Sequence, residues 1–442
     1  MIYKGKKEAY PGIGKIEYEG KKSRNPLAFK WYNPDQVVSG KKMKDHLRFA
    51  VAFWHSFCGD GTDQFGNATH MYPWKDLPSD DKIRRRLDAA FEFITKIGAP
   101  FYCFHDVDVV GGEGTVFDIE KRLEKFVPVM KKLQEQTGVK LLWGTANLFS
   151  NPRYMNGAAT NPDFAVLTNV SVQLKNAIDA TIFLGGENYV FWGGREGTET
   201  DSGKNPLEAS KRTREVMNFL CEYALDKKYD LRFALEAKPN EPRGDIYNPT
   251  TGHMLAFINT LDHPEMVGVN PEVAHEHMAG INFMHGVAQA WEAGKLFHID
   301  LNDQYPGRYD QDLRFGSRDI KAAFYLVKFL EDVGYSGSRH FDAHAYRTED
   351  YQGVKDFARG CMRTYLILKE KAAQFNHDPE IQALLEEINT DDGLMAPYFG
   401  KYSPEKAAAL KAQTFDRPAI ASRGLKYERL DQLTIEILLG VR

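Results

Sequence analysis

Short apolar or β-branched segments alternate with longer amphipathic segments along most of this 442-residue chain. Such short segments favour buried strands, and the segments between them have the periodicity of helices. Because ~30–50 residues separate most of the short segments, a crossover helix fits between successive parallel strands. The pattern predicts an α/β fold, a (β/α)8 TIM barrel, with a doubly wound open sheet as the alternative. The expected strands are 47–55, 101–106, 140–146, 188–194, 231–239, 266–275, 295–302 and 339–345.

Two parts of the chain fall outside this alternation. Residues 1–44 are polar and rich in Lys and Gly, which predicts an N-terminal extension on the surface. Residues 45–372 would form the barrel, and residues 373–442 have the pattern of helices without a barrel strand. Apolar faces in a tail that follows a closed barrel predict a helical arm that packs on another subunit or on its own.

Charge and composition exclude several classes of partner. The formal net charge is −4 and no Lys/Arg cluster forms a basic stripe, so nucleic acid is not an expected partner. No apolar run reaches membrane-spanning length and the N-terminus lacks an apolar signal core, which predicts no membrane association. The four cysteines have no CxxC spacing and are expected to be reduced thiols, as in a cytoplasmic protein.

Acidic side chains gather where the expected strands end, which is where barrel enzymes carry their chemistry. Buried carboxylates this numerous repel one another unless a cation compensates them. An oxygen-rich set with a single imidazole suits Mg²⁺, Mn²⁺ or Co²⁺, and the number of carboxylates indicates two ions. The residues at the ends of strands or in the loop after the seventh are His105, Asp106, Asp108, Glu236, Lys238, Glu272, His275, Asp300, Asp303, Asp310, Asp312, Asp342 and His344.

Each of these residues also has an ordinary interpretation. A single Asp at the end of a strand is commonly a helix cap or a turn residue in water. Lys238, which precedes Pro239, would be an ordinary surface lysine, and Asp303 in "LNDQYPG" is expected to be a loop residue rather than a ligand. Only the coincidence of acid or imidazole groups at four consecutive strand ends favours the metal site.

Aromatic residues are expected at the same mouth of the barrel. Trp54, Trp143 and Trp192 lie late in predicted strands, and Phe149 follows closely after one of them. Flat apolar faces in a polar site often stack on the C–H surfaces of a sugar, whereas the alternative for each residue is packing in the core.

Several motifs resemble those of the xylose isomerase family and occur in the family's order, from about residue 40 to the C-terminus. The resemblance implies a homotetrameric TIM barrel with two divalent metal ions per subunit, Mg²⁺, Mn²⁺ or Co²⁺. It implies that the enzyme interconverts D-xylose and D-xylulose, or D-glucose and D-fructose, by ring opening and a hydride shift. The motifs are "FHDVDV", "WGTANLFSNPRYMNGAATNPD", "VFWGGREG", "LEAKPNEPRGD", "NPEVAHEHMAG", "FHIDLN", "YDQDLRFG" and "HFDAHAYRTED".

The same resemblance implies a role for each matching residue. One ion would be bound by Glu236, Glu272, Asp300 and Asp342, and the other by Glu272, His275, Asp310 and Asp312, so that Glu272 bridges them. Lys238 would polarise the carbonyl oxygen of the substrate, and His105, held by Asp108, would move the proton that opens the sugar ring. The pocket would be formed by Trp54, Trp143, Thr145, Phe149 and Trp192, with Phe65 reaching the site of a neighbouring subunit.

The resemblance is not uniform along the chain. The front half, with its N-terminal extension, is similar to the long form of the family, and the part from about Leu231 is similar to the shorter actinobacterial form. His344 stands where many members have lysine. This mixed character leads to the hypothesis that the chain is a hybrid of the two forms. The functional alternatives are a related metal-dependent TIM barrel such as an apurinic endonuclease, and a barrel that binds sugar or metal without catalysis.

Overall fold

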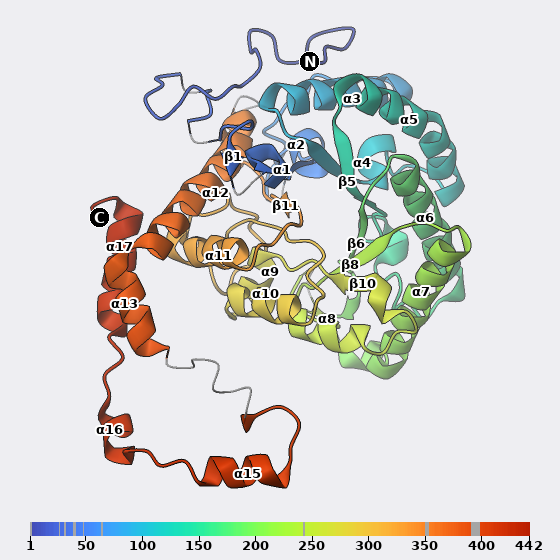
Figure 1. Cartoon of the computed structure of the whole chain (residues 1–442). Helices are drawn as coiled ribbons and strands as arrows, with labels where there is room; N and C mark the ends of the chain where they lie inside the picture. The colour runs from blue at the N-terminus through green and yellow to red at the C-terminus, as the bar shows by residue number, and fades with distance from the viewer. Residues whose placement is uncertain are drawn as a thin grey trace.

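A parallel sheet of seven strands forms the centre of the molecule, in the order β10-β8-β6-β5-β4-β3-β11 (Figure 1). The computed structural model describes residues 2–25, 27–30, 32–38, 41–46, 48–62, 65–241, 244–349, 353–389 and 398–442. The strands are β3 (Phe49–Ala52), β4 (Phe101–His105), β5 (Lys140–Thr145), β6 (Asn188–Trp192), β8 (Arg232–Glu236), β10 (Val267–Val269) and β11 (Arg339–His340).

Residues 295–302 join the two ends of this sheet. Leu296 forms a parallel bridge with Val269, and Asp300 bridges both Glu272 and His340. The seventh expected strand is therefore in place, but it pairs through single bridges and not as a regular strand. One physical reason is Pro271, which accepts from the backbone N–H of Asp300 at 3.1 Å but has no N–H to donate in return. The sheet closes on itself, and the predicted TIM barrel is confirmed.

Helices cover the outside of the barrel (Figure 1). They alternate with the strands as the sequence predicts, and several begin or end at recognisable caps. Thr115 and Asp118 form a capping box at the start of α5, and Gly98 ends α3 in the left-handed conformation. The long helices are α3 (Ser79–Ile97), α5 (Val116–Thr137), α6 (Phe164–Phe183), α7 (Pro206–Asp226), α8 (Thr251–Ile258), α10 (Phe283–Glu292), α11 (Ile320–Asp332) and α12 (Gly353–His377).

Short elements follow the strands at the rim and fill the loops. Besides the helical turns α2 and α9, two small antiparallel ribbons, β1 with β2 and β7 with β9, lie outside the barrel sheet. These elements are α1 (Met43–His46), α2 (Phe53–Phe57), α4 (Asp106–Val110), α9 (Val273–Met278), η1 (Pro152–Tyr154), η2 (Asp201–Gly203), η3 (Pro264–Met266), β1 (Val37–Val38), β2 (Lys41–Lys42), β7 (Gly197–Thr198) and β9 (Asp245–Ile246).

Most of the expected strands end earlier than predicted; the strand expected over 339–345, for example, ends at His340. The strand expected over 47–55 ends at Ala52, so Trp54 lies in α2 rather than late in a strand. Phe53 and Phe57, four residues apart, are buried on one side of that turn with ring centroids 5.0 Å apart, a spacing that suits a helix. The strand expected over 266–275 ends at Val269, and His275 lies in α9.

The N-terminal residues pack along α3. The carboxylate of Glu92, which is fully buried, accepts the backbone N–H groups of Ala9 and Tyr10 at 2.7 and 3.0 Å. Lys96 donates to Glu92 at 2.7 Å and to the carbonyl oxygen of Tyr10 at 2.7 Å. This buried ion pair fastens the extension to the outer layer of the barrel.

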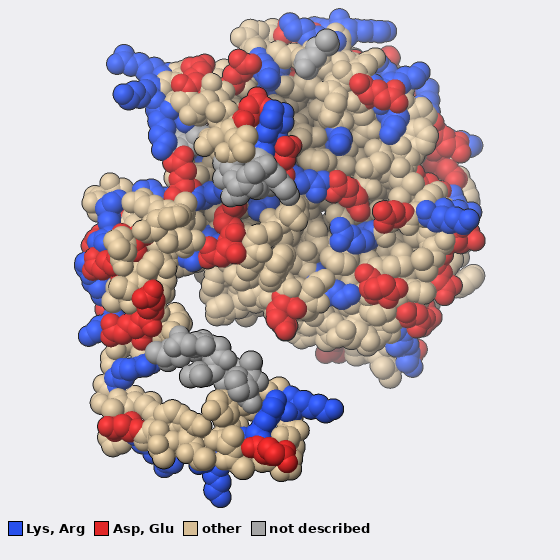
Figure 2. Space-filling model, viewed as in Figure 1, with Lys and Arg blue, Asp and Glu red and all other residues tan. Residues whose placement is uncertain are grey.

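The C-terminal tail leaves the barrel after α12, and its far part stands away from the body (Figures 1 and 2). The predicted division at residue 372 falls inside α12, which runs on to His377, and the division into domains stays a prediction. None of the helices in the described parts of the chain is both long and apolar enough to cross a membrane. The remaining tail helices are α13 (Pro379–Ile388), α15 (Pro404–Lys411), α16 (Arg417–Ser422) and α17 (Tyr427–Leu439).

Candidate metal centre

Four carboxylates converge at the carboxyl end of the barrel. Glu236 ends β8, Glu272 directly precedes α9, Asp300 lies on the bridging segment, and Asp342 follows β11. Each offers a ligand atom, and these atoms all lie within 4.8 Å of one another. The arrangement groups the four residues that the sequence assigned to a first ion.

A second group of carboxylates shares Glu272 with the first. Ligand atoms of Glu272, Asp310 and Asp312 lie within 4.8 Å of one another. His275 Nε2 is 3.3 Å from Glu272 Oε1 and 3.3 Å from Asp310 Oδ2, so the imidazole faces the same group. The four residues that the sequence assigned to a second ion are therefore also adjacent, with Glu272 common to both groups.

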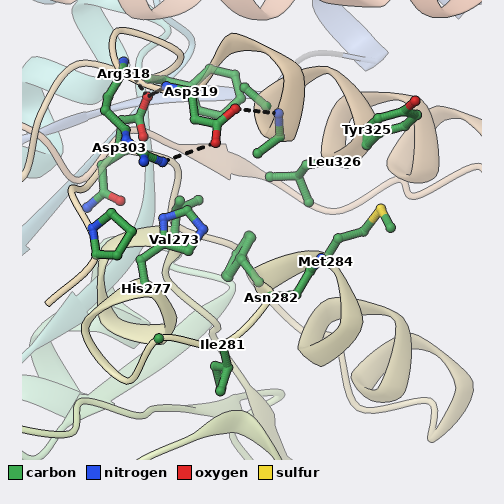
Figure 3. A pocket seen from close by; sticks show the side chains of 17 residues that line it. Val273, His277, Ile281, Asn282, Met284, Asp303, Arg318, Asp319, Tyr325 and Leu326 are labelled. Atoms are coloured by element: carbon green, nitrogen blue, oxygen red, sulfur yellow. Dashed lines mark hydrogen bonds and ion pairs between the residues drawn. The ribbon is translucent and has the colours of Figure 1, made fainter. Parts of the chain in front are cut away.

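Asp303 lies at the base of the loop that carries Asp310 and Asp312. Its backbone pairs with Leu313 in an antiparallel bridge, and its side chain accepts the backbone N–H groups of Arg318 and Asp319 at 2.7 and 2.9 Å. The side chain lines a cavity of about 350 Å³ that also includes residues of α9, α10 and α11 (Figure 3). Asp303 therefore acts as a loop residue, as the sequence predicts, and its bonds keep the loop closed.

Asp312 has a left-handed backbone, with φ of +42°. This conformation is uncommon for residues other than glycine, although Asp and Asn adopt it most readily. Strain of order 1–3 kcal/mol persists at such positions only where surrounding contacts impose the conformation, commonly at functional sites. The carbonyl oxygen of Asp312 accepts the N–H of His344 at 2.9 Å, which is one such contact.

Burial and mutual repulsion raise the pKa of three of these carboxyl groups well above their ordinary values. For Glu236 the causes are desolvation, then the charges of Asp300 and Asp342; for Glu272 they are desolvation, then Asp310 and Asp342. The pKa of Asp312 is raised by desolvation and by Asp310. In the absence of a cation these three groups therefore hold protons at pH values where free carboxyl groups are ionised.

The other two shifted carboxylates have positive partners. Burial opposes ionisation of Asp310, but the Lys238 ammonium at 2.7 Å and the neighbouring His275 hold its pKa well below the usual range. Burial likewise opposes ionisation of Asp300, but the neighbouring His340 outweighs it and lowers its pKa. The cluster thus combines ionised and proton-holding carboxyl groups, which is what an incompletely compensated negative site produces.

These residues fit a divalent cation. Asp310 Oδ1 is buried without a hydrogen-bond partner among the described residues, so its lone pairs are open to a ligand. The donor set is six carboxylates and one imidazole, which suits hard, oxygen-seeking ions. One bridging carboxylate between two groups is the arrangement expected when two such ions lie close together.

Metal binding should therefore release protons. Because the pKa values of Glu236, Glu272 and Asp312 are raised, an arriving ion must displace the protons that they hold, so apparent affinity should rise with pH and fall in acid. Titrating metal-free protein with Mn²⁺ in two buffers of different ionisation enthalpy measures the released protons. Binding that is independent of both buffer and pH would contradict the assignment.

His105 is held at one edge of the site by Asp108. Asp108 Oδ2 accepts both the backbone N–H and the ring Nδ1 of His105, at 2.8 and 2.9 Å. Because the carboxylate binds the Nδ1 proton, Nε2 of the neutral ring is left to act as a base. Burial lowers the pKa of His105, but the charge of Asp108 outweighs it and the net shift is upward.

A continuous aromatic wall leads from His105 to Lys238. The Trp54 ring packs edge to face on His105 with centroids 4.6 Å apart, and Phe149 also packs edge to face on that imidazole at 5.5 Å. Phe149 packs edge to face against Trp192 at 4.3 Å, and the Lys238 ammonium lies over the Trp192 ring at 5.0 Å. These aromatic side chains form one surface beside the acidic cluster.

The roles of the other three predicted pocket residues, Trp143, Thr145 and Phe65, toward a substrate stay predictions. Trp143 is 2% exposed and its indole N–H donates to His298 Nε2 at 3.0 Å, so its polar atom faces the barrel interior. Thr145 is buried and its hydroxyl donates to the carbonyl oxygen of Val190 on the neighbouring strand. Phe65 is 89% exposed, and its predicted contact with a neighbouring subunit stays a prediction.

The structure adds polar residues that sequence reasoning missed. Asn302 Nδ2 lies 2.7 Å from Glu272 and 3.1 Å from Asp312, and Asn270 Nδ2 lies 3.0 Å from Glu236 and 2.6 Å from Asp300. The sequence offered one signal for such residues: side chains two positions apart in a strand point to the same face of the sheet. Asn270, His298 and His340 each stand two positions before a predicted ligand. His55, which is 2.6 Å from Asp342 Oδ1, had no such signal.

A closed parallel barrel with an acidic cluster at the carboxyl ends of its strands defines a TIM barrel with a candidate metal centre. The family described as "Xylose isomerase-like TIM barrel" matches residues 115–361. A xylose isomerase from Thermus thermophilus is 51% identical over 401 residues, which cover 90% of this chain and 99% of that protein. One from Phocaeicola vulgatus is 38% identical over 438 residues, 96% of this chain and 98% of that protein. The chain belongs to the xylose isomerase family.

More distant solved structures share the fold. A D-tagatose 3-epimerase-like protein matches with a TM-score of 0.53 and 16% identity, over 74% of this chain and 100% of that chain. An L-ribulose 3-epimerase matches with a TM-score of 0.51 and 14% identity, over 75% of this chain and 99% of that chain. At these identities the likeness concerns the barrel alone.

Proposed function

We propose that this protein is a xylose isomerase that interconverts D-xylose and D-xylulose, and D-glucose and D-fructose, with two divalent metal ions. The observation that carries the proposal is the pair of carboxylate groups that share Glu272, next to the His105–Asp108 pair. Family membership supports the reaction, and the donor chemistry supports Mg²⁺, Mn²⁺ or Co²⁺. We assign Glu236, Glu272, Asp300 and Asp342 to one ion, and Glu272, His275, Asp310 and Asp312 to the other.

Ring opening is assigned to His105. An aldose is mostly closed, and opening it requires a proton to leave the 1-hydroxyl and another to reach the ring oxygen. Nε2 of His105 is the atom available for this transfer, because Nδ1 is bound to Asp108. Histidine suits this step because its ordinary pKa lies near neutral pH, and Asp108 fixes the orientation of this ring.

Lys238 is assigned to the carbonyl oxygen of the opened sugar. Burial opposes its charge, but Asp310 and Glu241, 2.7 and 3.4 Å away, raise its pKa above the ordinary value and keep it protonated. An ammonium at this position donates a hydrogen bond to O1 and stabilises the negative charge that develops there.

Isomerisation moves hydrogen with its electron pair from C2 to C1, while the proton of the 2-hydroxyl is transferred to O1. Divalent ions bound at the cluster would supply electrostatic stabilisation of the charge that develops on the substrate oxygens. The wall formed by Trp54, Phe149 and Trp192 would pack on the C–H faces of the sugar and exclude water. The strand-end carboxylates outside the two groups, Asp106 and Asp108, are bonded to Gln173 and to His105, so neither is assigned as a base for C2, which favours a hydride shift.

Incubating the purified protein with D-xylose and Mg²⁺ tests the reaction. We expect D-xylulose to form, EDTA to abolish its formation, and Mg²⁺, Mn²⁺ or Co²⁺ to restore it. A metal-loaded protein that converts neither xylose nor glucose would contradict the proposal. The charged residues on the face in Figure 2 are of both signs and interspersed, so that face offers no basic stripe for the endonuclease alternative.

The pH dependence of ring opening should follow Asp108. Because the charge of Asp108 is what raises the pKa of His105 against burial, Asp108→Asn should lower that pKa. The basic form of His105 would then persist to lower pH, so the acid limb of kcat/KM for xylose should move toward lower pH as overall activity falls. A pH profile at saturating metal measures the shift. An acid limb that does not shift would show that Asp108 does not set the pKa of His105 in the active enzyme.

We also propose that the chain is a homotetramer whose tail contacts other subunits. Residues 411–424 are all exposed and include Phe415 and Ile420, 68% and 60% exposed, in an arm that stands away from its own barrel (Figure 1). Apolar side chains placed this way favour burial on a second copy. Light scattering should give the mass of four chains, and Phe415→Asp should weaken assembly. A monomer of full activity would contradict this proposal.

A further inference from the structure

The carboxylate of Asp300 is enclosed on its inner side by side chains that do not belong to either predicted metal group. Asp300 is 0% exposed. His340 Nδ1 lies 2.6 Å from its Oδ1, and Asn270 Nδ2 lies 2.6 Å from its Oδ2. Both oxygens of Asp300 therefore accept hydrogen bonds from residues inside the barrel. These two bonds fix the orientation in which the carboxylate faces the other acidic residues.

His298 also approaches Asp300, but its geometry assigns it another partner. Its Nε2 is 3.1 Å from Asp300 Oδ1 and 3.0 Å from the indole Nε1 of Trp143. An indole N–H can only donate, so the nitrogen of His298 that receives it must be an acceptor. It cannot donate to Asp300 at the same time. Among the described residues, His340 is then the imidazole that donates to this carboxylate.

The ring of His340 has little room to turn. It stacks on the His298 ring with centroids 5.9 Å apart and planes 29° apart, and it lies 5.5 Å from both Trp54 and Trp143. Its backbone is paired with the bridging segment, since its carbonyl oxygen accepts from Leu301 at 2.8 Å. Packing and strand pairing together fix the donor nitrogen against Asp300.

We propose that His340 is a positioning residue that orients Asp300 for metal binding from inside the barrel, with Trp143 and His298 forming the wall that holds its ring. The inference rests on the proposed metal site. A hydrogen bond to the far lone pair of a carboxylate fixes its rotamer and leaves the other lone pairs for an ion. The effect is specific to the ion that Asp300 binds, because Asp310 and Asp312 have their own partners, Lys238 and Asn302.

A matched pair of variants separates the hydrogen bond from the volume of the ring. In His340→Asn the amide nitrogen takes the place of Nδ1, whereas in His340→Gln the nitrogen is one bond farther out. Metal-free proteins would be titrated with Co²⁺, with its visible absorption spectrum and calorimetry as readouts. We expect His340→Gln to weaken one of the two binding steps by ~10–100-fold and to alter its spectrum, and His340→Asn to retain most of the affinity.

The outcomes distinguish this inference from the proposed function. If the unaltered protein binds no Co²⁺, the metal site itself is wrong. If the unaltered protein binds two ions and both variants bind them with the same affinity as the unaltered protein, His340 does not position Asp300. The same conclusion holds if both metal-binding steps weaken together in both variants. Melting of the metal-free variants checks their folding. If His340→Gln does not fold, Asn270→Leu serves as a second variant, because it removes the hydrogen bond to the other oxygen of Asp300. We expect this variant to lose one of the two metal-binding steps. Unchanged metal binding in Asn270→Leu would overturn the proposal.

Discussion

Replacing Glu272 with glutamine should abolish binding of both metal ions and lower kcat/KM for xylose by ~10³-fold or more. Glu272 is the carboxylate common to the two groups, so its loss removes a ligand from each. Metal ions contribute several kcal/mol to stabilising transition-state charge, and about 4 kcal/mol corresponds to roughly three powers of ten in rate. Calorimetric metal titration and the rate of xylulose formation measure the two effects.

The same variant should not destabilise the metal-free protein. Desolvation and neighbouring carboxylates raise the pKa of Glu272, so the folded state holds its proton at pH values where the unfolded state ionises. That difference lowers folding stability progressively as pH rises above the unfolded pKa. Glutamine resembles the protonated acid and does not ionise, so it removes this effect. The melting temperature of metal-free Glu272→Gln should therefore equal or exceed that of the parent protein at neutral pH. In acid the two melting temperatures should differ less.

Glu276→Gln is the matched control. Glu276 is also 2% exposed and lies in α9, which begins directly after Glu272, but its carboxylate accepts the backbone N–H and hydroxyl of Thr251 at 2.7 and 2.6 Å. It belongs to neither predicted metal group. This control should bind metal while losing some stability, because a charge-assisted hydrogen bond is weakened. A Glu272→Gln protein that binds two ions normally would refute the bridging assignment.

Replacing His105 with alanine should reduce turnover of D-xylose by ~10²–10⁴-fold, the usual contribution of a positioned acid–base group. The loss should be much smaller for glyceraldehyde, which has no ring to open. The reason is that His105 is assigned only to the proton transfer at the ring, while Lys238 and the acidic cluster are assigned to the later step. Steady-state rates on the two substrates at saturating Mg²⁺ measure the contrast.

Metal content provides the control for this variant. His105 lies in neither group of metal-binding residues, so His105→Ala should bind both ions with unchanged affinity. Phe149→Leu would test whether loss of ring packing alone explains the result, since Phe149 packs on the same imidazole. Equal losses on xylose and glyceraldehyde would remove His105 from ring opening.

The sequence was most informative about which residues gather at the mouth of the barrel and least informative about where each strand ends. The barrel closes as predicted, and the seven predicted ligands lie close together at its mouth, while their assignment to two ions stays a prediction. The errors concern where strands end. At Ala52 the apolar run continues through Phe53 and Trp54 into the helical turn that follows the strand, so the sequence pattern does not mark the boundary. The seventh strand was predicted as regular, but the pairing partner Pro271 interrupts the hydrogen-bond ladder.

Periodicity and acidic strand ends were sufficient, without coordinates, to predict a barrel and a divalent-metal site at its mouth. Strand and helix periods depend only on neighbours in the chain. The cost of uncompensated charge depends on how many acidic residues meet at the rim, and not on the exact position of each. The tertiary structure alone decided that His340 and Asn270 enclose Asp300, that His55 reaches Asp342, and that Trp143 turns its N–H toward His298. Such contacts join residues up to 287 positions apart. They depend on strand register and rotamers that only the packed barrel determines.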